Sequence, residues 1–516
     1  MRQGTYRCIR QSLLRTVQRL GDVIGMGIML RSLSGIVLAG LLAGCALNPP
    51  RPPGDPAAAR CLALYDELDA AVAEYGATPS APARIAGFPY LRVDRFLADF
   101  RTQNLNPAQT VAWLTRLNAL DQEARRVEWA SLPEPVRMAL DRRHAAADTV
   151  PAALAQCAVT LRNADLRDPE RLALIRERAR VPDDYDTVNQ VLGLYPLTML
   201  PVDFGIYRYQ EEVRARFARP LADLPVRGEL RRYGPSAALT VVANGAAIPR
   251  DALGISEPTP AQAEALFAVH APIWEVDVAT ADDRPGAPYW RAEGVPTVDV
   301  AAPVVYRYLS HTRRRGEPLL QLNYLIWFAA RPRTGAFDLL GGPLDGVLWR
   351  VTLDRSGRPL LYDSIHACGC YHLLFPGPAL RLRAETADWA EPPLVPQPAP
   401  AVGKGERVVI RLASGSHELQ RVYADRPGAA TALEVREYAA LYAVPAGNSP
   451  PRSLFGPDGL VAGSERAERW LLWPMGVPSP GAMRERGRHA IAFVGRRHFD
   501  DADLLDRLFE PAEETR

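Results

Sequence analysis

The spacing of apolar residues changes once along this chain of 516 residues, near Asp223, and that change constrains the fold more than any other feature. Before it, apolar residues recur every three or four positions, as on a helix with one buried face. After it, apolar and polar residues alternate, as in half-buried strands. We therefore predict an α+β protein with a helical domain over residues 59–222 and a larger, mainly antiparallel β-rich domain with long loops over 223–505. Residues 506–516 are expected to form a tail.

The helices of the first region are marked by their start signals and apolar stripes. Asn106-Pro107 and Asp168-Pro169 each place an N-cap residue before proline at the first helical position. Two apolar stripes predict helices near residues 60–75 and 107–130: Cys61, Tyr65, Leu68, Val72 and Tyr75 on the first, and Trp113, Leu117, Leu120, Ala124 and Val127 on the second. Further helices are expected around residues 154–161, 170–175 and 206–217.

The strands of the second region are predicted from alternation and turn residues. Residues 273–278, 320–328, 408–412 and 489–494 are interpreted as strands, and residues 347–362 as a hairpin around a glycine-containing turn. Five prolines in residues 391–405 indicate a solvated loop rather than a packed segment. Five aromatic residues are expected in the core: Tyr324, Trp327, Trp349, Trp470 and Trp473.

A short apolar run over residues 36–42 follows Arg31 and ends in Leu42-Ala43-Gly44-Cys45. The unbroken run to Leu47 is shorter than the roughly 20 apolar residues that a membrane-spanning helix needs. Its form is that of a secretory signal peptide. Counted from Met29 the peptide is compact, so we expect translation to start there.

The tetrapeptide resembles the lipobox of bacterial lipoproteins, and the chain is similar in this respect to lipoproteins of proteobacterial envelopes. The resemblance implies that residues 1–44 are removed and that Cys45 carries a diacylglycerol and a further acyl chain such as palmitate. It also implies an outer-membrane location on the periplasmic side, because Ala46 replaces the aspartate that retains such proteins in the inner membrane. The membrane would then be a partner through the lipid anchor, and the proline-rich residues 45–58 would form a lipidated tether.

The charge balance argues against nucleic acid as a partner. Removal of the six arginines and one aspartate before Cys45 would turn the formal net charge of +2 into −3. A nucleic-acid-binding protein is instead expected to present a strongly basic surface.

Cys61 and Cys157 each lie on an apolar helix stripe, in a chain that is expected to reach an oxidising compartment. We predict a disulfide between them that joins two helices. The alternative is two buried free thiols.

The densest group of reactive side chains is His366, Cys368, Cys370 and His372, at every second position. In a regular strand the two histidines would be roughly 20 Å apart. A bend at Gly369 could instead bring three or four of these side chains onto one zinc ion. The pair of cysteines could also form a strained disulfide for thiol–disulfide exchange, or the segment could be a structural turn.

Residues from other predicted strands could approach this group. His417 and Glu418 are weaker candidates for the same metal site, and Asp363, His489 and His498 lie near the ends of predicted strands. His417 does not belong to a zinc-protease helix, because arginine occupies position 421 where that motif needs a second histidine.

The sequence contains no Gly-x-Ser-x-Gly, phosphate-binding loop or Cys-x-x-Cys, so none of these catalytic motifs predicts the molecular activity. We therefore expect a lipid-anchored envelope protein that acts as a binding or structural module, with a protein or small molecule as its partner. A zinc-dependent hydrolase with its site around residues 366–372 is the first alternative. A thiol–disulfide enzyme using Cys368 and Cys370 is the second.

Overall fold

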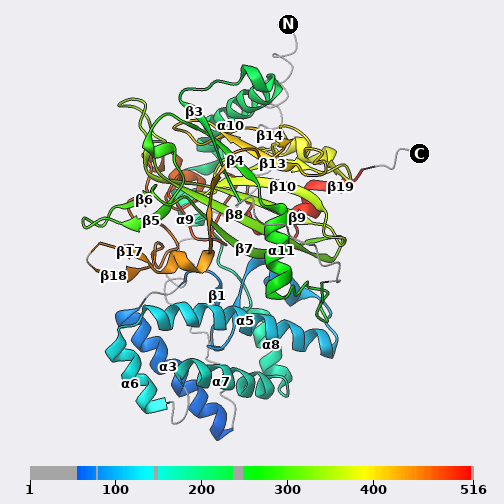
Figure 1. Ribbon diagram of the computed structural model, residues 1–516. Helices are drawn as coiled ribbons and strands as arrows, with labels where there is room; N and C mark the ends of the chain where they lie inside the picture. The colour runs from blue at the N-terminus through cyan, green and yellow to red at the C-terminus, as the bar shows by residue number, and fades with distance from the viewer. Residues whose placement is uncertain (1–54, 77–78, 145–148, 236–247, 448, 513–516) are drawn as a thin grey trace, which may run out of the picture. The chain divides into compact units, whose positions relative to one another are not determined.

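A computed structural model describes residues 55–76, 79–144, 149–235, 248–447 and 449–512 (Figure 1). The predicted signal peptide, Cys45 and most of the predicted tether lie outside these residues. The described part of the chain is helical at first and mainly antiparallel β-structure afterwards, which confirms the predicted α+β class.

The helices of the first region begin where the cap residues predict. Asn106 forms a capping box with Gln109 at the start of α5, and Asp168 accepts hydrogen bonds from the backbone at the start of α8. Asp55 caps α3 at Pro56, so the end of the predicted tether is helical instead of extended. The region contains α3 (Pro56–Tyr75), α4 (Arg95–Asp99), α5 (Pro107–Ser131), α6 (Glu134–His144), α7 (Val150–Asp165), α8 (Pro169–Arg178) and the short pair β1 (Ala83–Arg84) and β2 (Arg92–Val93).

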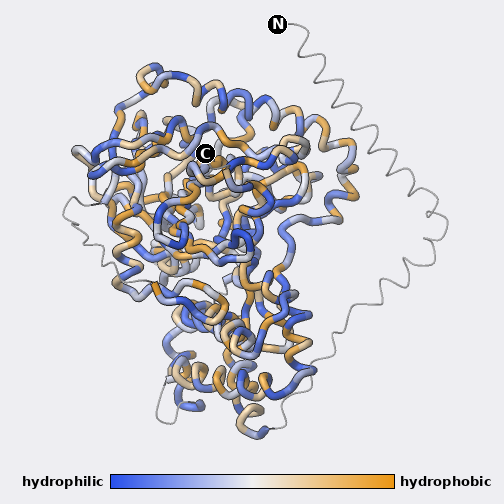
Figure 2. The backbone as a smooth tube through the Cα atoms, turned by 90° about the vertical axis from the view of Figure 1, so that its right-hand side faces the viewer, coloured by the Kyte–Doolittle hydropathy of each residue, from blue (hydrophilic) through white to orange (hydrophobic). Residues whose placement is uncertain are grey.

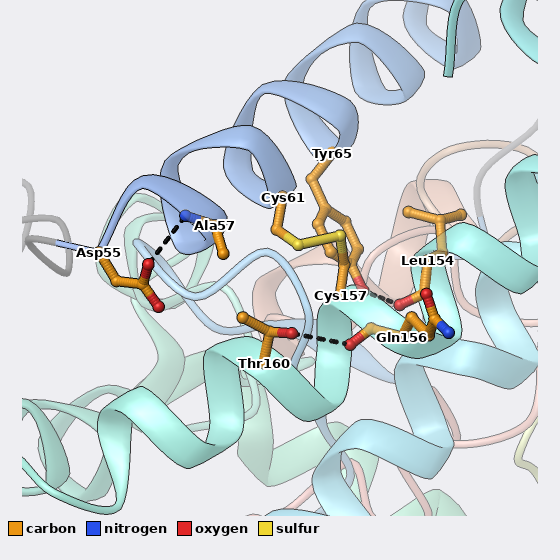
Figure 3. The surroundings of a disulfide bond; sticks show 8 residues. All are labelled: Asp55, Ala57, Cys61, Tyr65, Leu154, Gln156, Cys157 and Thr160. Carbon is orange, nitrogen blue, oxygen red and sulfur yellow. Dashed lines mark hydrogen bonds between the residues drawn. A yellow bond between two sulfur atoms is a disulfide. The ribbon is translucent and has the colours of Figure 1, made fainter. Parts of the chain in front are cut away.

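A disulfide between Cys61 of α3 and Cys157 of α7 confirms the predicted pairing (Figure 3). The two Cα atoms are 5.2 Å apart and the loop between the cysteines spans 96 positions. Beside it, the Tyr65 hydroxyl donates to the Leu154 carbonyl at 3.3 Å. In the chain-entropy model, a loop of this length contributes roughly 3 to 5 kcal/mol to the stability of the helical region.

Charged residues are buried inside this helical region. Arg92 is fully buried, donates to Asp121 at 3.2 Å and also contacts Glu128. Arg125 reaches Glu128 from the preceding turn of α5 at 3.0 Å. The four side chains form a buried ionic cluster between β2 and α5, in which each charge has an opposite partner.

A six-stranded sheet forms the centre of the second region, in the order β11-β10-β9-β8-β7-β16. Only the β16–β7 pair is parallel. Apolar residues on one face of β8, from Leu320 to Phe328, face the second sheet, while Leu325 and Trp327 pack on the opposite side. The strands are β7 (Val304–Arg314), β8 (Glu317–Arg331), β9 (Gly342–Leu353), β10 (Pro359–His366), β11 (Leu373–Pro376) and β16 (Glu434–Glu437).

A five-stranded sheet packs on this centre, in the order β14-β13-β4-β3-β15. The core between the sheets also contains Val213 and Phe217 of α10 (Tyr195–Ala218), so this helix packs on the β-rich region. Figure 1 shows α10 beside β13 and β14. The strands are β3 (Glu229–Gly234), β4 (Ile273–Val278), β13 (Arg407–Leu412), β14 (Leu419–Asp425) and β15 (Thr431–Ala432).

Smaller elements complete the β-rich region. They are the helix α11 (Pro260–His270), the 3-10 helices η4 (Ala281–Asp283) and η6 (Tyr438–Tyr442), and the strand pairs β5 (Ala287–Trp290) with β6 (Pro296–Asp299), β17 (Val444–Ala446) with β18 (Ser449–Arg452), and β12 (Leu380–Leu382) with β19 (Phe509–Pro511).

Four sequence-based predictions for this region are wrong. Residues 489–494 form one isolated bridge, Ala490 to His498, instead of a strand. Residues 506–511 are not a tail, because they form the end of α13 (Leu504–Leu508) and the strand β19. The proline-rich residues 391–405 have little regular structure, yet Leu394 is buried between the sheets. Trp470 and Trp473 are exposed by 70% and 39% instead of lying in the core.

Three helical segments lie together at the edge of the β-rich region: α9 (Thr187–Leu192), the first half of α10, and α12 (Arg469–Leu472) with the following 3-10 helix η7 (Trp473–Met475). The Asp186 amide donates to the Gly476 carbonyl at 2.7 Å. A Cβ atom on Gly193 would lie 2.4 Å from Pro474, so a larger residue would separate α9 from η7. Within the described residues, none of the helices combines the length and apolarity needed to span a bilayer, and Figure 2 shows mixed hydropathy along them.

Candidate functional site

The predicted bend at Gly369 is present. The segment 366–372 connects β10 to β11 as a tight turn, closed by a hydrogen bond from the His366 amide to the Cys370 carbonyl at 3.0 Å. Gly369 has φ +90°, and a Cβ atom there would lie 2.5 Å from the Ala490 carbonyl oxygen. Glycine is therefore required both by the backbone conformation and by the close contact.

The bend does not gather the four predicted ligands. His366 Nδ1 lies 3.3 Å from Asp345 Oδ1, whereas His372 Nε2 lies 3.1 Å from Asp363 Oδ2. The Cys368 sulfur accepts a hydrogen bond from the Cys370 amide at 3.3 Å. Across the ranges that the structure describes, no three histidine, cysteine, aspartate or glutamate side chains are arranged to hold a metal ion.

His417 lies near this turn, as the sequence suggested it could, but it is connected to His366 only through the carboxylate of Asp345. Its Nδ1 lies 2.8 Å from Asp345 Oδ2, so His366 and His417 share the two oxygens of one buried side chain. The ring of His417 stacks on Phe328 with centroids 3.9 Å apart. Burial would raise the pKa of Asp345, but the two histidines outweigh it and hold this pKa well below its usual range.

The other weak candidate, Glu418, is engaged by arginines. It lies 2.9 Å from Arg216 and 3.5 Å from Arg331. His489 Nε2 donates to the Ala367 carbonyl at 3.2 Å, and burial lowers the pKa of His489 to about 4. His498 lies farther along the C-terminal segment, 3.4 Å from the Asp184 amide.

Asp363 is held by an arginine as well as by His372. Arg350 donates twice to it, at 2.9 and 2.6 Å, and the Arg350 guanidinium lies 3.4 Å from the Phe499 ring centroid. Burial is the largest influence on His372 and lowers its pKa despite the neighbouring carboxylate.

A cavity of about 670 Å³ lies against the turn that carries these residues. One wall is the turn from Cys368 to His372, and another is the inner side of α10. The α10 wall includes the apolar residues Pro201, Val202 and Ile206. Most of the remaining walls are also apolar and come from distant segments: Leu340, Leu394, Leu471, Leu472, Val477, Ile491, Phe493, Leu504 and Leu508.

Two carboxyl groups line the cavity. Glu391 accepts hydrogen bonds from the Phe493 and Val494 amides at 2.6 and 2.9 Å, and burial raises its pKa. Burial also raises the pKa of Glu468, to about 7, and the charges of nearby arginines do not overcome this effect. Both groups therefore favour the neutral form, which can donate a hydrogen bond, more than ordinary glutamates do.

The two cysteines of the turn are free thiols, and both line the cavity. A hydrogen bond with Cys368, together with burial, raises the pKa of Cys370 well above its ordinary value. Because the thiolate is the nucleophile in thiol–disulfide exchange, this environment suppresses reactivity.

Sequence reasoning placed residues 368–372 at the site but missed most of its walls. Glu391 was assigned to a solvated loop, and α10 contributes wall residues that resemble ordinary core positions. One signal was present, because residues 187–202 contain no charged side chain. The structure brings these segments together through contacts between residues far apart in the chain.

No family model matches this chain, and the searches of curated proteins and of solved structures also return no match.

Proposed function

We propose that the protein is a lipid-anchored binding protein of the outer membrane, facing the periplasm, and that its cavity holds a ligand with a fatty-acyl-like apolar part. The observation that carries the proposal is the 670 Å³ cavity with mainly apolar walls. Small-molecule sites are typically about 300–1,000 Å³, mostly apolar, with a few polar groups that orient the ligand.

The polar groups of the cavity indicate what kind of polar group the ligand carries at the end away from its apolar part. Burial raises the pKa of Glu468 to about 7, so near neutral pH this group is partly neutral and can donate a hydrogen bond to a ligand oxygen. Arg484 is already engaged, because its Nε donates to the Cys368 carbonyl at 3.0 Å. These features support an uncharged acyl ester or a similar neutral amphiphile as the ligand class.

No specific observation supports either of the two alternative functions. His366 and His372 contact different aspartates, which does not favour a zinc-dependent hydrolase built on both. The raised pKa of Cys370 does not favour a thiol–disulfide enzyme.

Mass spectrometry of the purified full chain tests the cavity. We expect organic solvent to extract an amphiphile at close to one molecule per chain. Ile206→Trp, which fills part of the cavity from its α10 wall, should abolish both this ligand and binding of the fluorescent neutral probe methyl cis-parinarate. Arg208→Trp is the matched control, since Arg208 is on the same helix, has a side chain that is 66% exposed and is not a cavity wall. Full retention of ligand by the Ile206→Trp variant would contradict the proposal.

Metabolic labelling tests the anchor, which rests on Leu42-Ala43-Gly44-Cys45. Cells grown with a fatty-acid analogue should label the wild-type chain, and the label should fractionate with outer membranes. Cys45→Ser should abolish labelling, because the acylated sulfur is lost, whereas Cys368→Ser should not. A wild-type chain without label would rule out the anchor.

A further inference from the structure

Large apolar side chains are exposed on α9, on the first half of α10 and on α12 with η7. Exposure reaches 69% for Leu192, 63% for Phe204 and 70% for Trp470. We name this surface the α9–α12 face, and it consists of Val188, Val191, Leu192, Leu194, Leu197, Leu200, Phe204, Tyr207, Trp470, Leu471 and Trp473. Exposed apolar patches of this extent mark interaction sites on proteins.

The helices that carry the residues of the α9–α12 face are packed against one another. The Gln190 side chain donates to the Met475 carbonyl at 3.1 Å, and Asp186 is bonded to Gly476. Gly193 allows α9 to approach Pro474. The Glu468 amide, just before α12, donates to the Leu339 carbonyl at 3.1 Å, which places the loop carrying the exposed Phe337 next to α12.

The composition of the face fits a bilayer better than a protein partner. Residues 187–202 contain no charge, and burial raises the pKa of the first charged residue after them, Asp203. Two tryptophans and Arg469, whose guanidinium lies 4.8 Å from the Trp470 ring centroid, are the residue types that occupy membrane–water interfaces. Helices with one such apolar side lie in the interface plane without crossing the membrane.

The face also borders the cavity. Thr198, Pro201 and Val202 of α10 are cavity walls, as are Leu471 and Leu472 of α12. A second copy of the chain or another protein seated on the face would cover these segments. A bilayer could instead supply an acyl ligand there without leaving the ligand in water.

We propose that the α9–α12 face docks on the surface of a phospholipid bilayer, and that the cavity exchanges its acyl ligand with that bilayer between α10 and α12. The exchange step rests on the binding function proposed above. Docking itself rests on the exposed apolar residues.

Depth-dependent fluorescence quenching tests the docking. The full-length chain, purified from the cell fraction that contains it, is mixed with vesicles of phosphatidylethanolamine and phosphatidylglycerol that include brominated phosphatidylcholine. Bromine quenches tryptophan within the hydrocarbon region. Wild type should be quenched, and Trp470→Phe with Trp473→Phe should remove most of the quenching. Trp129→Phe is the control, since Trp129 is partly buried against the helical core and is not part of the α9–α12 face, and it should leave the quenching unchanged.

Two outcomes would overturn the docking: no quenching of wild type, or unchanged quenching of the double variant. If quenching is absent and a dimer is dispersed by Leu192→Ser with Leu197→Ser, the face is an interface between two copies of the chain. Binding of methyl cis-parinarate without vesicles separates this proposal from the previous one. Intact probe binding without quenching overturns docking and the exchange step, and leaves the ligand proposal supported. Quenching without probe binding overturns the ligand proposal and the exchange step, and leaves docking supported.

Discussion

Within the described part of the chain, the two longest helices are α5 with 25 residues and α10 with 24, and they use their apolar residues in opposite ways. α5 buries Trp113, Leu114 and Leu117 in the helical core. α10 buries only its last turns against the sheets, and its first half lies between the cavity and solvent. Apolar content alone therefore does not distinguish a core helix from a helix that forms a binding surface.

The same contrast holds for buried charge. Along α5, Asp121, Arg125 and Glu128 are buried with opposite charges as neighbours. Burial raises the pKa of Asp121, and it also raises the pKa of Glu468 at the cavity beside α12, to about 7. The difference lies in the partners, because Asp121 has two arginines within ion-pair distance, whereas Glu468 forms no ion pair among the described residues. A buried carboxyl group without such a partner beside a cavity is a candidate functional group.

Arg92→Met should produce the largest effect, because it removes the fully buried arginine that pairs with two fully buried carboxylates. Asp121 would then keep only Arg125 as an ion-pair partner among the described residues, and Glu128 would keep Arg125 and Arg84. We expect the free energy of unfolding, measured by urea denaturation, to fall by about 3 to 5 kcal/mol. Arg143→Met is the matched control on α6, since Arg143 is 61% exposed and pairs with Glu67 at the surface. Its change should stay below about 1 kcal/mol.

A Leu197→Ser variant of α10 tests the comparison between α5 and α10 by the same measurement of the free energy of unfolding. Leu197 is 56% exposed, so its replacement should change the free energy of unfolding by about 0.5 kcal/mol or less. If it destabilised the protein as much as Arg92→Met, the first half of α10 would be a core element, and the comparison between α5 and α10 would fail.

Glu468 should give a smaller, pH-dependent effect. Its pKa is about 7 in the folded protein and 4.5 ordinarily, so its neutral form is favoured on folding. Its contribution to stability is therefore fully present below pH 4.5 and is lost as the pH rises through 7. In wild type we expect the free energy of unfolding to decline by on the order of 1 to 3 kcal/mol across this interval, and Glu468→Gln should remove this decline.

The control for this titration is Glu211→Gln, because Glu211 is 55% exposed on α10. Its pH–stability curve should match that of wild type. A wild-type curve that is flat between these pH values, or a decline that persists in the Glu468→Gln variant, would contradict the assignment.

Local patterns in the sequence predicted much of the fold. Asn106-Pro107 marks the start of α5, the alternation of residues 320–328 matches β8 and its two faces, and the stripes of α3 and α7 placed Cys61 opposite Cys157. The first two features depend on residues within a few turns or one strand, where caps and periodicity act directly. The disulfide spans 96 positions, and its prediction needed the expected oxidising compartment as well as the two apolar stripes.

The candidate site could be predicted only in part, because its walls come from segments without strong periodicity. The sequence drew attention to residues 366–372, yet the carboxylates that orient their histidines, Asp345 and Asp363, are selected by strand register. Trp470 and Trp473 were expected in the core, since a sequence pattern shows that a side chain is apolar but does not show whether another element covers it.

The carboxylate of Asp345, which His366 and His417 share, restricts the movement of one side of the cavity. The turn that follows β10 and the turn between β13 and β14 depend on the same acceptor, through His366 and His417. Moving either turn alone would remove one of the two histidine partners of the buried Asp345 carboxylate, so the positions of the two turns are coupled. The α10 side of the entrance is held by neutral hydrogen bonds, such as that from the Gln210 side chain to the Pro392 carbonyl at 2.8 Å, and we expect a ligand that enlarges the entrance to displace this side.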